Sequence, residues 1–183
     1  MSEAEEQIAA TVRAAAGNVP VLLCGSRARG DAGPGSDWDV VAVLPLVRIP
    51  LALGRLRRMG EELSAELGAP VSVNPLPAGR LRRVGDSLFV WKLAREARVL
   101  AAPRGFALPT AGEPPVTEAT AFSYLASAAL FLFQPEGARK ALLHVAQLRL
   151  MRRGKYESGL AEALAAAGDE RLTVAAAAAG EEA

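Results

Sequence analysis

The chain has 183 residues, of which 51% are hydrophobic and 22% charged, so a folded globular protein is expected rather than a disordered one. A net charge of +1 argues against bulk attraction to nucleic acid or an anionic membrane, and a single cysteine excludes an internal disulfide framework. The acidic N-terminus does not fit a secretory signal and no apolar run is long enough to span a bilayer, so we expect a cytoplasmic protein with no membrane partner.

The first 102 residues have the pattern of an α/β (or α+β) domain. Ser2 can cap a first helix that runs to about residue 16, because several acidic residues would lie in its positive first turn. We then expect, in chain order, a buried strand at 19–24, a glycine-rich loop at 25–35, a strand at 38–44, a helix at 49–67, a strand at 70–75 and a helix from 88 to about 100.

Residues 103–116 are the best candidate for a linker, because prolines and glycines concentrate there. Beyond them the sequence predicts helices at 117–133, 136–153 and 157–167. The alanine-rich stretch at 173–179 is either a frayed helix end or a tail. We therefore expect a small all-helical domain at 117–183 that follows the α/β domain at 1–102.

The residues that carry chemistry lie between the first two expected strands. The first strand ends in Gly25-Ser26, ten residues follow, and Asp37-Trp38-Asp39 opens the second strand. Because side chains alternate faces along a strand, both aspartates should point the same way and Trp38 should point toward the core. Adjacent carboxylates repel each other unless a cation lies between them, and such hard oxygen ligands suit Mg²⁺.

The Gly25-Ser26 turn is suited to hold a phosphate. Glycine lets the backbone turn sharply and approach a ligand closely, and Ser26 offers both a hydroxyl and a backbone N–H. Arg27 and Arg29 can add guanidinium groups, whose shape matches phosphate. A phosphate-binding turn beside a pair of carboxylates predicts a site for a nucleoside triphosphate.

The segment 21–43 resembles the hallmark of the nucleotidyltransferase superfamily that includes DNA polymerase beta, especially its minimal stand-alone members. The resemblance implies a short mixed sheet flanked by helices, with ATP or another nucleoside triphosphate as substrate and two Mg²⁺ ions. It implies transfer of a nucleoside monophosphate, with AMP favoured, to a hydroxyl of a small molecule or a protein. The residues it assigns to the nucleotide are Gly25, Ser26, Arg29 and Ser36, and those it assigns to catalysis and metal binding are Asp37 and Asp39.

One position departs from the family pattern. Members usually carry a third carboxylate on a later strand, which binds a metal and can act as general base, but the matching strand at 71–75 offers only Ser72 or Asn74. Asp86 and Glu96 lie downstream, outside a matching position. The alternative function is therefore a catalytically degenerate, antitoxin-like module that binds nucleotide or a partner protein.

A third hypothesis concerns the helical part. The spacing of Arg139 and His144 resembles the RNase motif of HEPN domains, helical modules that often partner minimal nucleotidyltransferases, so an RNase activity and a helical partner protein are further possibilities. A lone histidine on an amphipathic helix is more often structural. A basic cluster could touch a polynucleotide, but a net charge near zero favours a solvated loop and argues against a nucleic-acid partner. This cluster consists of Arg80, Arg82 and Arg83.

Overall fold

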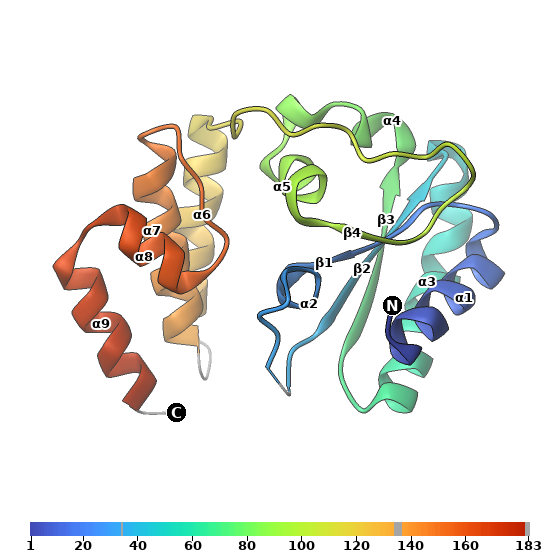
Figure 1. Ribbon diagram of the computed structural model, residues 1–183, viewed down its shortest axis with the longest axis horizontal. Coiled ribbons are helices and arrows are strands. Elements are labelled where there is room, and N and C mark those ends of the chain that lie inside the picture. Colours follow the sequence, from blue (N-terminus) through green and yellow to red (C-terminus); the bar gives the residue numbers. More distant parts are fainter. Residues whose placement is uncertain (34, 134–136, 182–183) are drawn as a thin grey trace. The chain divides into compact units, whose positions relative to one another are not determined.

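The computed structural model describes residues 1–33, 35–133 and 137–181 (Figure 1). The chain divides into two compact units, with the boundary in the sequence between Ala111 and Gly112. The first unit contains a sheet with helices on both faces. The second unit is helical. Within the described residues, no helix has both the length and the apolar character needed to cross a membrane.

The sheet of the first unit is mixed. Among the described residues it has four strands in the order β3-β2-β1-β4. These are β1 (Val21–Cys24), β2 (Trp38–Leu44), β3 (Val71–Pro77) and β4 (Arg98–Ala101). Strand β1 is antiparallel to both β2 and β4, whereas β2 and β3 run parallel. The expected short mixed sheet is confirmed, and β3 lies at one of its edges.

Helices cover both faces of this sheet (Figure 1). Helices α1 (Glu3–Ala16) and α3 (Ile49–Leu67) pack on one face through a buried cluster that includes Val12, Leu23, Val40, Leu56 and Leu63. On the opposite face a second buried cluster joins the sheet to α4 (Ala78–Leu81) and α5 (Leu88–Glu96). The remaining short helical segments are α2 (Gly25–Arg29), η1 (Leu46–Arg48) and η2 (Val84–Asp86). We call the face covered by α4 and α5 the α5 face.

Local signals in the sequence explain the ends of the two long helices. The Ser2 hydroxyl accepts a hydrogen bond from the Glu5 N–H at 3.4 Å, and the Glu5 carboxylate accepts one from the Ser2 N–H at 2.9 Å, which is a capping box at the start of α1. Helix α3 begins with a proline in its first turn and ends at Gly68, whose φ of 62° is left-handed. Both helices were therefore predicted with correct ends.

Two local predictions were wrong. Residues 25–29 were expected to be loop but form α2, which ends at Gly30 in the left-handed conformation. The helix expected from 88 to about 100 ends at Glu96, and Arg98–Ala101 forms β4 instead. This strand pairs with β1, buries Leu100 against the α1–α3 cluster and forms an ion pair from Arg98 to Glu5 of α1. These contacts with distant residues override the helical pattern.

The second unit contains α6 (Glu118–Phe131), α7 (Gly137–Met151), α8 (Leu160–Ala167) and α9 (Glu170–Glu181). Small and aliphatic side chains of α7 and α8, among them Ala146, Leu150 and Ala163, form its buried cluster. The predicted start of the second helix, at residue 136, lies outside the described residues. The alanine-rich stretch at 173–179 belongs to α9, so it is helix and not a tail.

Gly60 marks the closest approach of α3 to β3. A Cβ built at this glycine would lie only 2.9 Å from the Val71 carbonyl oxygen, whereas one built at Gly54 of the same helix meets no atom within 4 Å. We expect Gly60→Ala to lower the free energy of unfolding by about 1–3 kcal/mol, although alanine is the better helix former. Gly54→Ala should leave it unchanged or raise it slightly. Urea unfolding of both variants measures the difference, and equal effects would mean that α3 does not approach β3 this closely.

Candidate active site

Strand β2 presents Asp39 on the α5 face. Its neighbours Trp38 and Val40 are buried on the opposite face, with exposed fractions of 7% and 0%, while Asp39 is exposed. Asp37 is exposed and lies just before the strand begins. The alternation follows from the pleat of the strand, so the buried tryptophan fixes the direction in which the Asp39 carboxylate points.

Gly25 provides the space in which the Asp39 carboxylate lies. The backbone of Gly25 has a φ of 69°, and a Cβ built there would lie 2.7 Å from Asp39 Oδ2. Because β1 and β2 pair with Cys24 opposite Asp39, the first residue after β1 must come this close to the carboxylate. Any side chain at position 25 would be strained and would collide with Asp39, which explains the glycine physically. Ser26 follows it in α2 and is half-buried.

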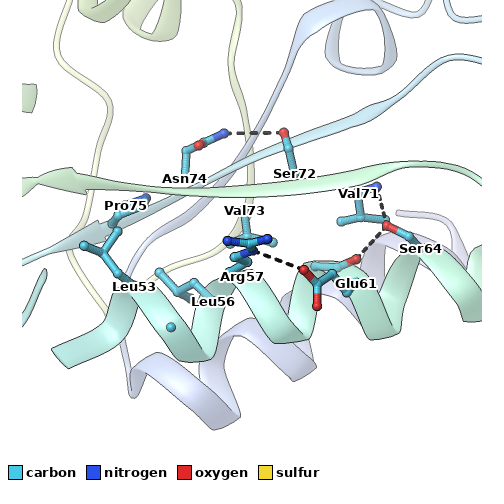
Figure 2. Close-up of a pocket in the computed structure, with 12 residues that line it drawn as sticks. Leu53, Leu56, Arg57, Glu61, Ser64, Val71, Ser72, Val73, Asn74 and Pro75 are labelled. Carbon is cyan, nitrogen blue, oxygen red and sulfur yellow. Dashed lines mark hydrogen bonds and ion pairs between the residues drawn. The ribbon is translucent and has the colours of Figure 1, made fainter. Parts of the chain in front are cut away.

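On the other side of Asp39, strand β3 contributes neutral groups. Ser72 is the register partner of Asp39, and its hydroxyl donates a hydrogen bond to Asp39 Oδ1 at 3.0 Å. The Asn74 amide donates in turn to the Ser72 hydroxyl at 3.4 Å, as Figure 2 shows. Of the two residues that the sequence left open, Ser72 is therefore the one beside Asp39. An alcohol lies where a carboxylate would complete an acidic triad.

Arg27 ties the 27–36 segment to the start of β2. Its Nε and Nη2 donate to the Ser36 carbonyl oxygen at 3.0 and 2.6 Å, and its guanidinium carbon lies 4.0 Å from the centroid of the Trp38 ring. The Ser36 hydroxyl accepts a hydrogen bond from the Gly33 N–H at 2.9 Å. Arg27 thus makes its contacts within the protein, and the Ser36 hydroxyl is hydrogen-bonded to the backbone of Gly33. The nucleotide contact assigned to Ser36 stays a prediction.

A pocket of about 250 Å³ lies next to Asp39 on the α5 face. Gly25, Arg29 and Asn74 line it together with Asp39. Helix α5 supplies another wall, whose polar and aromatic residues are Phe89, Lys92 and Glu96. These three positions recur at helical spacing and so share one face of α5. Sequence reasoning missed Phe89 and Lys92 and placed Glu96 outside the site, since only the packing of α5 on the sheet brings them to Asp39.

The charges in this pocket are mixed. Arg29 Nη1 lies 3.6 Å from Glu96 Oε2, and Arg29 Nη2 lies 3.1 Å from Asp31 Oδ2. Lys92 adds a second cation to the same pocket. A triphosphate entering beside Asp39 would therefore meet two basic side chains, Arg29 and Lys92. The predicted nucleotide residues Gly25 and Arg29 lie in one pocket.

The described residues of the site show no acidic triad. Across residues 1–33, 35–133 and 137–181, no three His, Cys, Asp or Glu side chains lie close enough together to hold a metal ion. Asp37 and Asp39 are the predicted metal ligands, of which Asp39 lines the pocket together with Glu96, and Ser72 and Asn74 can add neutral oxygen atoms. Mg²⁺ is commonly held by one or two carboxylates and completes its shell with water and substrate phosphates. This donor set fits one such ion.

Cys24 lies at the end of β1 beside the acidic pocket. Burial is the main cause that raises the pKa of its thiol to about 12, and the nearby carboxylates of Asp39 and Glu96 add to the effect. Since the thiolate is the reactive form, the thiol stays protonated and inert throughout the physiological pH range. We expect iodoacetamide at pH 8 to alkylate Cys24 at least about a hundredfold more slowly in the folded protein than in urea. Mass spectrometry of timed samples measures both rates, and equal rates would contradict this account of the pocket.

The residues behind the RNase alternative belong to the helical unit, and those behind the nucleic-acid alternative lie in and next to α4. His144 of α7 packs against the rings of Tyr124 and Phe131, with centroid distances of 4.8 and 5.1 Å. This packing fits a structural histidine in the helical unit. Arg139 is exposed, as are the three arginines of the basic cluster at 80–83.

The chain matches one family model over part of its length. Residues 5–89 match the model described as a nucleotidyltransferase domain. The matched segment runs from α1 into α5 and contains Gly25, Ser26, Asp37, Asp39 and Ser72. No curated protein matches the chain.

The chain also resembles solved structures. One is spectinomycin adenyltransferase AAD(9) from Enterococcus faecialis with ATP and spectinomycin, at a TM-score of 0.64 and 14% identity, over 96% of this chain and 88% of that one. At this identity the similarity shows the fold alone. A toxin-antitoxin structure with AMP-PNP matches at a TM-score of 0.42 and 18% identity, over 55% of this chain and 74% of that one. That likeness is too low to support an argument.

Proposed function

Residues 5–89 form a nucleotidyltransferase domain, and from this premise we propose that the protein transfers AMP from ATP to a hydroxyl of a small molecule or a protein with the help of Mg²⁺. The observation that carries the proposal is the position of Asp39. Its carboxylate occupies space that only a glycine at position 25 leaves open, and it faces a pocket with two basic residues. Asp37 lies two residues earlier in the sequence.

The protein's own groups prepare Asp39 for this role. The Ser72 hydroxyl donates to Oδ1 and so fixes the orientation of the carboxylate, with Oδ2 toward Gly25. Asp37 and Asp39 would hold the Mg²⁺, while Arg29 and Lys92 would offset the charge of the triphosphate. Bound with the nucleotide, the metal supplies electrostatic stabilisation of the phosphate oxygens.

The reaction itself is an in-line substitution. The acceptor hydroxyl oxygen forms a bond to the α-phosphorus, the bond from that phosphorus to the bridging oxygen of the β-phosphate breaks, and pyrophosphate leaves. The hydroxyl proton passes to solvent, because Ser72 is neutral and cannot serve as the base that a carboxylate would provide at its position. Catalysis would rest on positioning and electrostatics, and turnover should be slow.

Ser72 also favours the second candidate function, a nucleotide- or partner-binding module without catalysis. Such a module would keep the Mg²⁺–ATP site and lack the transfer step. A helical partner protein and a cytoplasmic location remain predictions under either function. The preserved pair of aspartates favours the enzyme, because two neighbouring carboxylates repel each other without a bound cation.

Transfer of label from ATP distinguishes the two functions. The purified chain is incubated with Mg²⁺ and ATP labelled at the α-phosphate, first with spectinomycin or aminoglycosides and then with host lysate, beside the Asp37→Asn/Asp39→Asn double variant. Label on an acceptor with the wild type alone supports the enzyme. Mg²⁺-dependent ATP binding without transfer, lost in the double variant, supports the binding module.

A further inference from the structure

A second cavity lies beside the edge of the sheet. It is a groove of about 590 Å³ between α3 and β3, shown in Figure 2. Leu53, Leu56 and Val73 give it apolar walls, and Arg57 and Glu61 form an exposed ion pair along α3. Asn74 and its neighbours on β3 line the groove, and Asn74 also lines the 250 Å³ pocket that contains Asp39. The groove and the pocket of the proposed active site therefore share Asn74 of the edge strand as a lining residue.

The hydrogen bonds of β3 show which of its backbone groups face this groove. The Trp38 N–H donates to the Pro70 carbonyl at 2.7 Å, so in this parallel pair the even-numbered residues of β3 bond to β2. The Val71 N–H points the other way and donates to the Ser64 hydroxyl at 2.8 Å. Ser64 in turn donates to the Gly60 carbonyl at 2.6 Å, which anchors this cap to α3.

Val73 follows Val71 by two residues, so its N–H and C=O also point outward. Val73 is 9% exposed and lines the groove together with Pro75. An edge strand with an outward N–H and C=O is a template for a further strand. Pro75 has no N–H, so the hydrogen bonds to an added strand end at this residue. They can involve the N–H and C=O of Val73 and the C=O of Pro75. Such a short edge suits a transient contact with a substrate rather than a permanent interface.

We propose that the groove binds an extended polypeptide segment of a protein acceptor, which adds to the edge of β3 as a short strand. This rests on the proposed function and narrows its acceptor from a small molecule or protein to a protein. The residue opposite Val73 would direct its side chain into the groove against Leu53 and Leu56. Its two neighbours in sequence would lie on the opposite face of the added strand, next to Ser72 and Asn74 and one strand away from Asp39.

The chemistry of the two sides defines the segment that fits. The groove side offers Leu53 and Val73 beside the Arg57–Glu61 ion pair, and the α5 face holds the proposed transfer site. An apolar residue flanked by hydroxyl residues would suit both sides. Backbone hydrogen bonds would supply binding and the alternate side chains would supply selectivity, as in other strand-addition complexes.

Peptide binding tests the inference without requiring transfer. The probe is an acetylated and amidated peptide of alternating serine and valine with lysines at both ends, titrated into the full chain without nucleotide. We expect the Val73 amide to exchange with solvent at least about tenfold more slowly when the peptide is present. Gly54 lines the groove and has open space at its Cβ, so Gly54→Trp should fill the groove and weaken binding at least about tenfold, while Gly54→Ala should bind as the wild type does.

The outcomes separate this inference from the proposed function. An unchanged exchange rate at Val73, or equal binding by Gly54→Trp, overturns the inference. Label transfer to spectinomycin with no peptide binding also overturns it and leaves the transferase intact. Peptide binding at Val73 that Gly54→Trp abolishes supports the inference, even if no label moves from ATP to any acceptor, a result that would count against the transferase alone.

Discussion

Asp39→Asn should lower the rate of nucleotidyl transfer by at least about a thousandfold and leave the fold intact. The substitution keeps the size of the side chain and an oxygen that can accept from the Ser72 hydroxyl. It removes one of the two charges that, in the proposed function, would hold the Mg²⁺ that offsets the charge of the triphosphate. Asp39 is exposed and makes no buried ion pair, so the free energy of unfolding should change little. Initial rates with α-labelled ATP and urea unfolding curves measure the two effects.

Asp86→Asn is the matched control for this variant. Asp86 is exposed, lies in η2 and lines neither the pocket nor the groove, so transfer should remain at the wild-type rate. A wild-type rate in Asp39→Asn, or an equal loss in both variants, would show that the reaction does not depend on the carboxylate beside Gly25.

Ser72→Asp should restore the missing acid and increase transfer at least about tenfold in the presence of Mg²⁺. The Ser72 hydroxyl lies 3.0 Å from Asp39 Oδ1, so a carboxylate at this position would adjoin the existing pair and add a metal ligand and a base. Without a divalent cation the same change should lower the melting temperature, because neighbouring carboxylates repel each other. Added Mg²⁺ should raise the melting temperature of Ser72→Asp more than that of the wild type.

Ser72→Asn is the control that separates the effect of the added charge from the effect of the larger side chain. It introduces a side chain of nearly the same shape as aspartate without the charge, so neither the gain in transfer nor the Mg²⁺-dependent stabilisation should appear. A Ser72→Asp protein that transfers no faster than Ser72→Asn would mean that the proton acceptor and the additional metal ligand are supplied elsewhere or are not needed.

Much of the sheet and the core of the site follow from local sequence signals. Strand β2 was predicted to the residue because Trp38 and Val40 must be buried while Asp39 is not, and Pro45 follows its end. The close approach of Gly25 to Asp39 follows from a sharp turn after β1 and the antiparallel pairing of β1 with β2. Both features depend on neighbours in sequence or on one strand pair.

The rest depends on packing between distant segments. Strand β4 exists because Arg98 pairs with Glu5 and Leu100 joins the core, neither of which the local pattern reveals. Phe89 and Lys92 reach the pocket only because α5 packs over the Asp39 face. The sequence offered Arg27 as a possible phosphate ligand. Its partners are the Ser36 carbonyl and the Trp38 ring, which come close to it only in the folded structure.

The fate of each ATP phosphate is the most direct test of the central claim, that the chain transfers a nucleoside monophosphate. Parallel reactions with Mg²⁺ contain ATP labelled at either the α- or the γ-phosphate, and acceptor and pyrophosphate are separated. We expect α-label on the acceptor and γ-label in pyrophosphate, with both signals lost in Asp39→Asn. Label from the γ-phosphate on the acceptor would instead show phosphoryl transfer. Neither transfer nor Mg²⁺-dependent nucleotide binding by the folded protein would contradict the claim outright.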